Sequence, residues 1–180
     1  MKKCMVMLFI VLFASGISAA PKKVVKKMPA KKQEISIKSP AFKEMGYLPA
    51  KYTGDGEGKT PPLVFENVPA SAKSLVLIME DPDAPYGTFD HWLMFNIPPK
   101  TKAVKEGSVP KGALRGKNSA QDLGYVSPYP PRGKPHRYVF KLYALNTMLK
   151  LKEGADKKQI EKAMEGHIIS QASLTGLFVR

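Results

Sequence analysis

Cysteine, histidine and tryptophan are scarce in this chain of 180 residues, which contains one Cys, three His and one Trp. The single cysteine, Cys4, cannot close an intrachain disulfide, and no CxxC pair or Cys/His spacing is present to hold zinc. We therefore expect neither a disulfide framework nor a metal site, and no cofactor. P-loop, GxGxxG and GxSxG motifs are also missing, which removes the usual sequence signals for nucleotide binding and for a serine nucleophile.

Long apolar segments are missing too. The longest mainly apolar run, Met5 to Ile17, has about 13 residues, fewer than the ~20 that span a bilayer. It follows Met1-Lys2-Lys3 and precedes Ser18-Ala19-Ala20, which is the order of a secretory signal peptide. We predict a signal peptide over 1–19, a disordered basic linker over 20–34 and one folded domain over 35–180, exported to the periplasm or secreted. An uncleaved N-terminal anchor is the alternative.

Acidic residues are outnumbered, since 15 Asp and Glu accompany 29 Lys and Arg, for a formal charge of +14. Two basic residues lie in 1–19, and six lie in 20–34 beside Glu34, so residues 35–180 carry a net charge of +7. A lysine-rich tail can bind nucleic acid by counterion release. In an exported chain we expect instead a weak contact with an anionic envelope surface and no nucleic-acid partner. A solvating linker without any partner is equally compatible with the sequence.

Proline is abundant: the chain has 16, about 9% against a usual ~5%, and each costs ~3 kcal/mol inside a helix. A helical bundle is therefore nearly excluded. Short β-like runs between Gly and Pro residues predict strands at 35–38, 63–66, 75–79, 89–97 and 137–145. The last two runs alternate, which predicts a mostly antiparallel sheet system.

Alternation also predicts which side chains share a face. In the run 89–97 it places His91, Leu93, Phe95 and Ile97 on one face, and Trp92, Met94 and Asn96 on the other. One segment indicates a helix that packs on the sheet: Asp156 caps its start, and an apolar face near the 3.6 period continues up to Gly176. The residues of that face are Ile160, Met164, His167, Ile168 and Ala172.

Two short stretches concentrate residues that suit a binding site. They are Asp81-Pro82-Asp83-Ala84-Pro85 before Asp90-His91-Trp92, and Pro130-Pro131-Arg132-Gly133 before His136-Arg137-Tyr138. Proline restricts the residue before it to extended conformations, so the carboxylates lie on a stiff loop after a strand. If the strands that carry the two histidines are neighbours of the 75–79 strand, His91, His136, Tyr138 and Asp81 converge in one small polar pocket.

Each of these residues also has a purely structural interpretation. Asp81 and Asp83 are typical turn residues whose carboxylates bond nearby backbone amides. His91 on an apolar strand face is as often a core residue as a ligand-binding one. Arg132 and Arg137 can lie in solvent or pair with acids, His167 is interpreted as a packing residue, and Trp92 as core rather than pocket wall.

The two stretches resemble the signature blocks of the phosphatidylethanolamine-binding protein family, in particular its bacterial Raf-kinase-inhibitor-like branch. The similarity runs from about Ser39 to Arg180 and includes PPLVFENVP, KSLVLIMEDPDAP, GKNSAQDLGY and AMEGHIISQASLTG. The resemblance implies a mainly β fold, an antiparallel β-sandwich of a large and a small sheet with a C-terminal helix. That fold agrees with the strand pattern.

The same resemblance implies a small pocket for phosphate or related anions, in keeping with a phospholipid head group. The positions that match its lining are Asp81, His91, His136 and Tyr138, with Ala84, Pro85, Pro131 and Gly133 in the walls. Ser127-Pro128-Tyr129 stands where bacterial members often have Gly-Pro-Cys, and Lys134-Pro135 lengthens the approach to His136.

We therefore expect an exported, non-enzymatic protein that binds a small anionic or phosphorylated ligand, such as a phospholipid head group. One alternative is a protein-interaction module that inhibits a kinase or a protease. A less favoured alternative is a hydrolase that uses His and Asp, because these groups also serve in acid–base catalysis.

Overall fold

The structure, a computed structural model, describes residues 34–180, so the predicted signal peptide and all of the predicted linker except Glu34 lie outside the described residues. This part of the chain contains nine strands, one α-helix and one 3-10 helix. In chain order they are β1 (Ser36–Lys38), β2 (Gly46–Tyr47), η1 (Ala50–Tyr52), β3 (Leu63–Glu66), β4 (Ser74–Asp81), β5 (Phe89–Ile97), β6 (Ala103–Val104), β7 (Leu114–Arg115), β8 (His136–Leu145), α1 (Lys157–Met164) and β9 (Ile168–Phe178).

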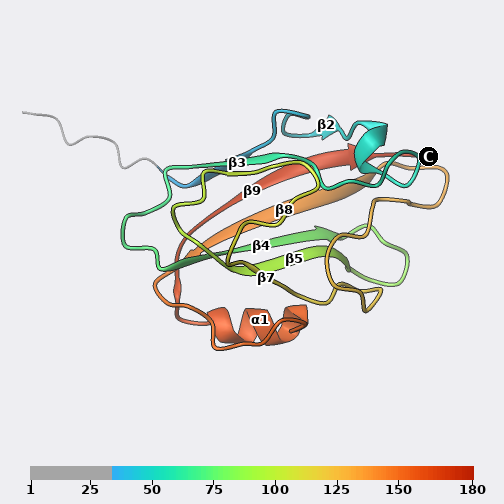
Figure 1. The fold of residues 1–180 in the computed structure, drawn as a ribbon. Helices are drawn as coiled ribbons and strands as arrows, with labels where there is room; N and C mark the ends of the chain where they lie inside the picture. The colour runs from blue at the N-terminus through green and yellow to red at the C-terminus, as the bar shows by residue number, and fades with distance from the viewer. Residues whose placement is uncertain (1–33) are drawn as a thin grey trace, which may run out of the picture. The chain divides into compact units, whose positions relative to one another are not determined.

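The strands form two sheets (Figure 1). The larger has the order β2-β9-β8-β4-β5-β7 and the smaller the order β1-β3-β6. Neighbouring strands are antiparallel except β2, which runs parallel to β9. The predicted mainly β fold with a large and a small antiparallel sheet is therefore confirmed, and all five predicted strands are present within two residues of their expected ends.

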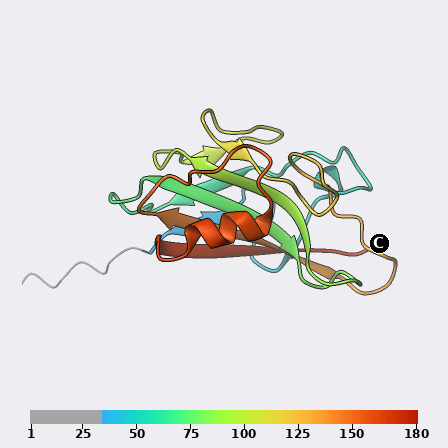
Figure 2. The same ribbon diagram turned by 90° about the horizontal axis from the view of Figure 1, so that it is seen from below.

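Strand β4 lies at the centre of the larger sheet, and all eight of its residues are buried. Its continuous apolar run fits this position, because both faces of the strand are covered. On one face, Leu75, Leu77 and Met79 belong to the core between the sheets. On the other, Val76 and Ile78 belong to a second core with Ile160 and Met164 of α1, which lies across that face of the sheet in Figure 2.

The C-terminal helix is shorter than the sequence predicts. Asp156 caps it as expected, since its carboxylate accepts a hydrogen bond from Gln159 N while the Gln159 side chain accepts one from Asp156 N. The helix ends at Met164, and Gly166 has a φ of 72°, a conformation that suits glycine after a helix. The prediction that it continues to Gly176 is wrong. No helix among residues 34–180 combines the length and apolar composition needed to cross a bilayer.

Residues 168–176, predicted as helix, belong to β9, which pairs along the whole of β8. Leu174 and Phe178 contribute to the core between the sheets, and Ala172 packs against it, so the buried positions follow a period of two. The spacing of Ile168 and Ala172 from Met164 matched a helix only by chance, because a short apolar pattern can fit both the helical period of about 3.6 and the strand period of two. His167 is exposed between α1 and β9 and its Nδ1 lies 2.9 Å from Asn146 Oδ1.

Because of bulges in β5, two of its residues lie on a different face of the sheet from the one that strict alternation predicts. The pairing of β4 with β5 shifts between Met79 and Glu80 and again between Leu75 and Leu77. The second shift lies at Asn96, whose φ is 53° and whose side chain bonds the backbone of Leu149 through both amide atoms. Ile97 therefore joins Trp92 and Met94 in the core between the sheets rather than Leu93 and Phe95.

Candidate ligand-binding site

Asp81 and His136 meet where β4 ends and the antiparallel strand β8 begins. Asp81 Oδ2 accepts a hydrogen bond from His136 Nδ1 at 2.7 Å, and Oδ1 accepts one from the backbone N–H of Asp83 at 2.8 Å. Asp81 is only 3% exposed. Its carboxylate thus closes the turn after β4, as the structural interpretation predicted, and also fixes the orientation of the His136 imidazole.

Asp83 and Arg137 form a second acid–base pair beside the first. Arg137 donates to Asp83 from its backbone N–H and from its guanidinium, at 2.7 to 2.9 Å. The guanidinium hydrogen bonds outweigh the opposing effect of burial and lower the pKa of Asp83 to about 2. Consecutive residues of β8 are therefore held to the loop after β4 by two carboxylates, which makes this corner of the sheet rigid.

His91 reaches the same corner from β5. It is the extra residue of the first bulge, because Met79 pairs with Trp92 while Glu80 pairs with Asp90. As a result His91 and Trp92 both face the side of the sheet on which Tyr138 lies, whereas strict alternation separates them. Trp92 is 1% exposed and belongs to the core, as expected.

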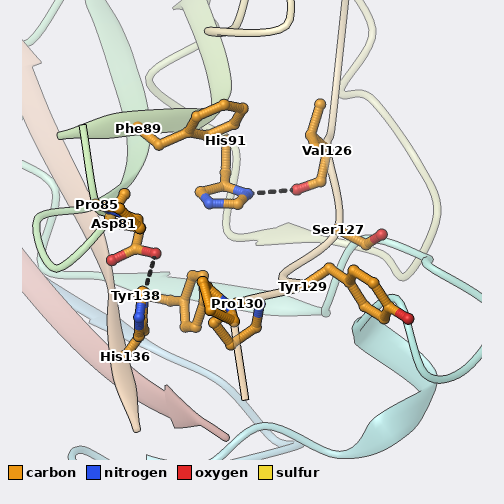
Figure 3. A pocket seen from close by; sticks show the side chains of 12 residues that line it. Asp81, Pro85, Phe89, His91, Val126, Ser127, Tyr129, Pro130, His136 and Tyr138 are labelled. Atoms are coloured by element: carbon orange, nitrogen blue, oxygen red, sulfur yellow. Dashed lines mark hydrogen bonds and ion pairs between the residues drawn. The ribbon is translucent and has the colours of Figure 1, made fainter. Parts of the chain in front are cut away.

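The His91 ring is held by a segment that no sequence signal identified. Its Nδ1 lies 2.7 Å from the carbonyl oxygen of Val126, and the N–H of Val126 donates to the carbonyl oxygen of His91 at 2.9 Å. Burial lowers the pKa of His91 and favours the neutral ring. Figure 3 shows the other ring nitrogen turned toward the interior of the site, on the side of Asp81 and Tyr138.

Tyr138, two residues after His136 on β8, packs edge-on against the His91 ring with 5.2 Å between the ring centroids. The residue is fully buried, and its hydroxyl has no hydrogen-bond partner among residues 34–180. Burial raises the pKa of this phenol, so the hydroxyl keeps its hydrogen at neutral pH. A buried hydroxyl without a partner is uncommon and costs stability, which singles it out as a candidate binding group.

These side chains surround one pocket of about 200 Å³ (Figure 3). This is less than the volume of typical drug-sized sites and suits a head group or a small anion. Its lining consists of Asp81, Ala84, Pro85, Phe89, His91, Val126, Ser127, Tyr129, Pro130, Pro131, His136 and Tyr138. The structure thus brings together seven of the eight predicted site residues. Gly133 is not among the lining residues and lies in the exposed loop before β8.

The pocket is built for hydrogen bonding. Within residues 34–180 no group of three or more His, Cys, Asp or Glu side chains is arranged to hold a metal ion. Each imidazole instead uses Nδ1 for a protein acceptor, Asp81 for His136 and Val126 for His91. The Nε2 atoms remain for a ligand, and each accepts a hydrogen bond from it when the ring is neutral or donates one when the ring is protonated.

Comparisons with known proteins agree with the predicted family and fold. The sequence profile of phosphatidylethanolamine-binding proteins matches residues 38–179. The chain belongs to this family. A UPF0098 protein of Methanothermobacter thermautotrophicus is 46% identical over 151 residues, covering 81% of this chain and 99% of that one. A UPF0098 protein of Pyrococcus horikoshii is 47% identical over 156 residues, covering 82% and 79%.

Two solved structures of the phosphatidylethanolamine-binding protein family are similar in three dimensions. A homologue from Chlamydia trachomatis superposes with a TM-score of 0.79 and 41% identity, covering 82% of this chain and 98% of the other. YbcL of Escherichia coli, described as a member of the mammalian family, gives a TM-score of 0.77 at 26% identity, covering 82% and 99%. The resemblance read from the two motifs is therefore confirmed at the level of family and fold.

Some of the positions at which this chain departs from the expected bacterial family pattern lie in the wall of the pocket. Ser127 and Tyr129 line the pocket, and the Arg180 guanidinium lies 3.5 Å from the centroid of the Tyr129 ring. Gly54 permits this placement, because a Cβ atom there would come within 2.5 Å of Tyr129 Cδ2. Lys134 and Pro135 are exposed and outside the lining. Ser127 and Tyr129 thus contribute to the pocket wall, whereas the contact between Asp81 and His136 involves neither of them.

Proposed function

We propose that this member of the family is an exported, non-enzymatic protein that binds a small phosphorylated or other anionic ligand of head-group size. One observation carries the proposal. Two imidazoles, each held at Nδ1 by a protein acceptor, line the same 200 Å³ pocket as Tyr138, whose buried hydroxyl has no hydrogen-bond partner among residues 34–180. This arrangement offers three hydrogen-bonding groups at fixed positions, and little ordering is needed when a ligand binds.

The chemistry of a phosphoethanolamine head group suits this set of side chains. His136 Nε2 can donate to a phosphate oxygen when the ring is protonated, and the Asp81 carboxylate at 2.7 Å from Nδ1 would then balance the charge. The buried carboxylate of Asp81 and the neutral ring of His91 accept hydrogen bonds, which an ammonium group can donate. The name of the family refers to a lipid whose head group carries both of these charges, and this supports the same ligand class here.

Export is proposed from the first 20 residues alone. Two lysines, an apolar run and the small residues Ser18-Ala19-Ala20 occur in the order of a signal peptide. The six lysines between Pro21 and Lys32 would then meet the anionic envelope surface, with a weak and salt-sensitive contact. Fractionation of cells and N-terminal sequencing of the purified protein test this part; an N-terminus at Ala20 is expected, and retention of Met1 in the cytoplasmic fraction would contradict it.

The binding proposal is tested by isothermal titration calorimetry with inorganic phosphate and phosphoethanolamine. We expect saturable binding to the parent protein and a loss of at least about tenfold in affinity for His136→Ala, since hydrogen bonds to charged groups contribute about 1.5–3 kcal/mol. His167→Ala is the matched control, because His167 is the exposed third histidine and contacts Asn146 instead of the pocket. Absence of binding, or an unchanged affinity in His136→Ala, would refute the proposal.

The same samples distinguish binding from catalysis. In the proposed function the ligand leaves the pocket unchanged, so phosphoethanolamine recovered after prolonged incubation should be intact. Release of inorganic phosphate that depends on His91 and His136 would show instead that the pocket hydrolyses phosphoesters.

A further inference from the structure

The two ring nitrogens of His91 have different surroundings. Nδ1 faces the carbonyl oxygen of Val126 at 2.7 Å, and because a carbonyl only accepts, Nδ1 must carry the hydrogen. The backbone N–H of Val126 returns a hydrogen bond to His91 at 2.9 Å, so both residues are fixed relative to each other. A flipped ring would lose the side-chain hydrogen bond. Nε2 is therefore the atom that His91 presents to the pocket (Figure 3).

The surroundings of the His91 ring favour its neutral form. His91 is 5% exposed, and the loss of hydration lowers its pKa more than the nearby carboxylates raise it. The charged or titratable groups around it are Asp81 on β4, Asp90 on its own strand, and His136 and Tyr138 on β8. In a neutral ring with the hydrogen on Nδ1, Nε2 carries a lone pair and can only accept.

A ligand in this pocket consequently faces a lone pair at His91 and, a short distance away, the carboxylate of Asp81. A fully ionised anion would place an oxygen lone pair against the Nε2 lone pair. We infer that His91 selects ligands that bring a hydrogen to this position: phosphate and phosphomonoesters as monoanions, in preference to sulfate and to phosphodiesters that carry no other donor such as an ammonium group. This inference rests on the proposed anion-binding function and adds to it the protonation state of the ligand.

Phosphate chemistry makes the selection effective near neutral pH. A phosphomonoester has its second pKa near about 6, so a monoanion with one P–OH group is well populated there. Sulfate has the same shape and no hydrogen at this pH, and a phosphodiester has none on its charged oxygens. With sulfate, the hydrogen bond from a P–OH group to His91 Nε2 is replaced by repulsion between two lone pairs. We therefore expect the phosphate monoanion to bind at least about tenfold more tightly than sulfate.

The experiment measures the affinities of the parent protein for inorganic phosphate, methyl phosphate, sulfate and dimethyl phosphate by calorimetry. At about pH 6 the first two should bind at least about tenfold more tightly than the last two. The preference for phosphate over sulfate should shrink toward about pH 8.5, where phosphate has lost its second proton. If protonation of His91 governed binding instead, acidification would strengthen phosphate and sulfate equally.

His91→Asn is the matched variant, because the asparagine amide nitrogen occupies the place of Nδ1 beside Val126 and no atom replaces Nε2. Its ratio of phosphate to sulfate affinity should fall toward one, while His167→Ala should keep the parent ratio. Equal binding of phosphate and sulfate by the parent at about pH 6 would overturn the inference and leave anion binding intact. An undiminished ratio in His91→Asn would also overturn it. Absence of binding by all four anions would refute the proposed function and this inference with it.

Discussion

Arg137 donates three hydrogen bonds to Asp83, one from its backbone and two from its guanidinium, directly beside the 2.7 Å contact between His136 and Asp81. The two pairs join the same two segments, the loop after β4 and the start of β8. Their exposures differ: the side chains of His136 and Asp81 are 12% and 5% exposed, whereas those of Arg137 and Asp83 are 53% and 30% exposed. The outer pair thus holds the loop in place, while the inner pair lines the pocket.

Asp83→Asn should lower the free energy of unfolding by an amount that depends on pH. The pKa of Asp83 is lowered to about 2, below its value in an unfolded chain, so the ionised carboxylate stabilises the fold above about pH 4. This contribution is lost as the pH falls through about 2. Solvent screens the half-exposed pair, so the loss at neutral pH should be about 1 kcal/mol.

The measurement is urea denaturation of parent and variant between about pH 7 and pH 2.5, over which the difference should shrink. Asp122→Asn is the control, because Asp122 is exposed and its side chain makes no hydrogen bond within the described residues. A difference between Asp83→Asn and the parent that does not change with pH would contradict this explanation.

Tyr138→Phe should reduce the affinity for phosphate without reducing the stability of the fold. The Tyr138 hydroxyl is buried without a partner among residues 34–180, so its removal should leave the free energy of unfolding unchanged or raise it by up to about 1 kcal/mol. If a bound phosphate supplies the missing partner, its affinity should fall about fivefold.

Tyr125→Phe is the matched comparison. The Tyr125 hydroxyl donates to the carbonyl oxygen of Tyr52 at 2.6 Å, so removal leaves that carbonyl without this partner and should cost about 1–2 kcal/mol. Thermal unfolding and phosphate titration of both variants check the pair. A loss of stability in Tyr138→Phe equal to that in Tyr125→Phe would mean that the Tyr138 hydroxyl has a structural role.

The central strands could be predicted because their residues follow simple rules. The buried run of β4 and the alternation of Tyr138, Phe140 and Leu142 on β8 reflect direct contact with the core. The bulges at His91 and Asn96 could not be predicted, since one extra residue in the pairing of two strands leaves no pattern in the sequence of either strand. For β9 the glycine at position 166 was the available signal, because glycine typically follows the end of a helix.

The site was predictable where the side chain itself carries the chemistry, as with Asp81 and His136. Phe89 was missed although it lies two residues before His91, and the period of two places it on the same face, where its ring centroid lies 4.8 Å from that of His91. Val126 contributes its backbone carbonyl to the His91 ring, so no residue type at that position could indicate its role.

Glu80→Gln should destabilise the fold without changing the pocket. Glu80 lies on the α1 side of the sheet, 7% exposed, and pairs with Lys141 and with Lys157, which also bonds Asp90 at 2.9 Å. Burial alone would raise the pKa of Glu80, but the two lysines hold it below its ordinary value. Burial likewise opposes the charge of Lys157, and the two carboxylates nevertheless raise its pKa to about 12.

Removal of the Glu80 charge leaves two partly buried ammonium groups undercompensated, so we expect a loss of about 2 kcal/mol in urea denaturation. The phosphate affinity should stay within about twofold of the parent, since the cluster lies on the opposite face of the sheet from Asp81. Glu153→Gln, which breaks an exposed pair with Arg115, is the control and should change stability little. A large loss of phosphate affinity in Glu80→Gln would show that the two faces are coupled.

The protonation state of His91 can be measured directly by NMR of the ring nitrogens. We expect the His91 signals to report a hydrogen on Nδ1. Because burial lowers the pKa of His91, its ring should still be mainly neutral at about pH 6.5, where an ordinary histidine is half protonated. The unfolded chain binds this proton more readily than the folded one, so this histidine makes stability fall as the pH drops below about 6.5. His91→Asn should remove that part of the pH dependence. Signals that show a hydrogen on Nε2 at neutral pH would contradict the Val126 contact, and with it the lone pair on which selection of a protonated phosphate depends.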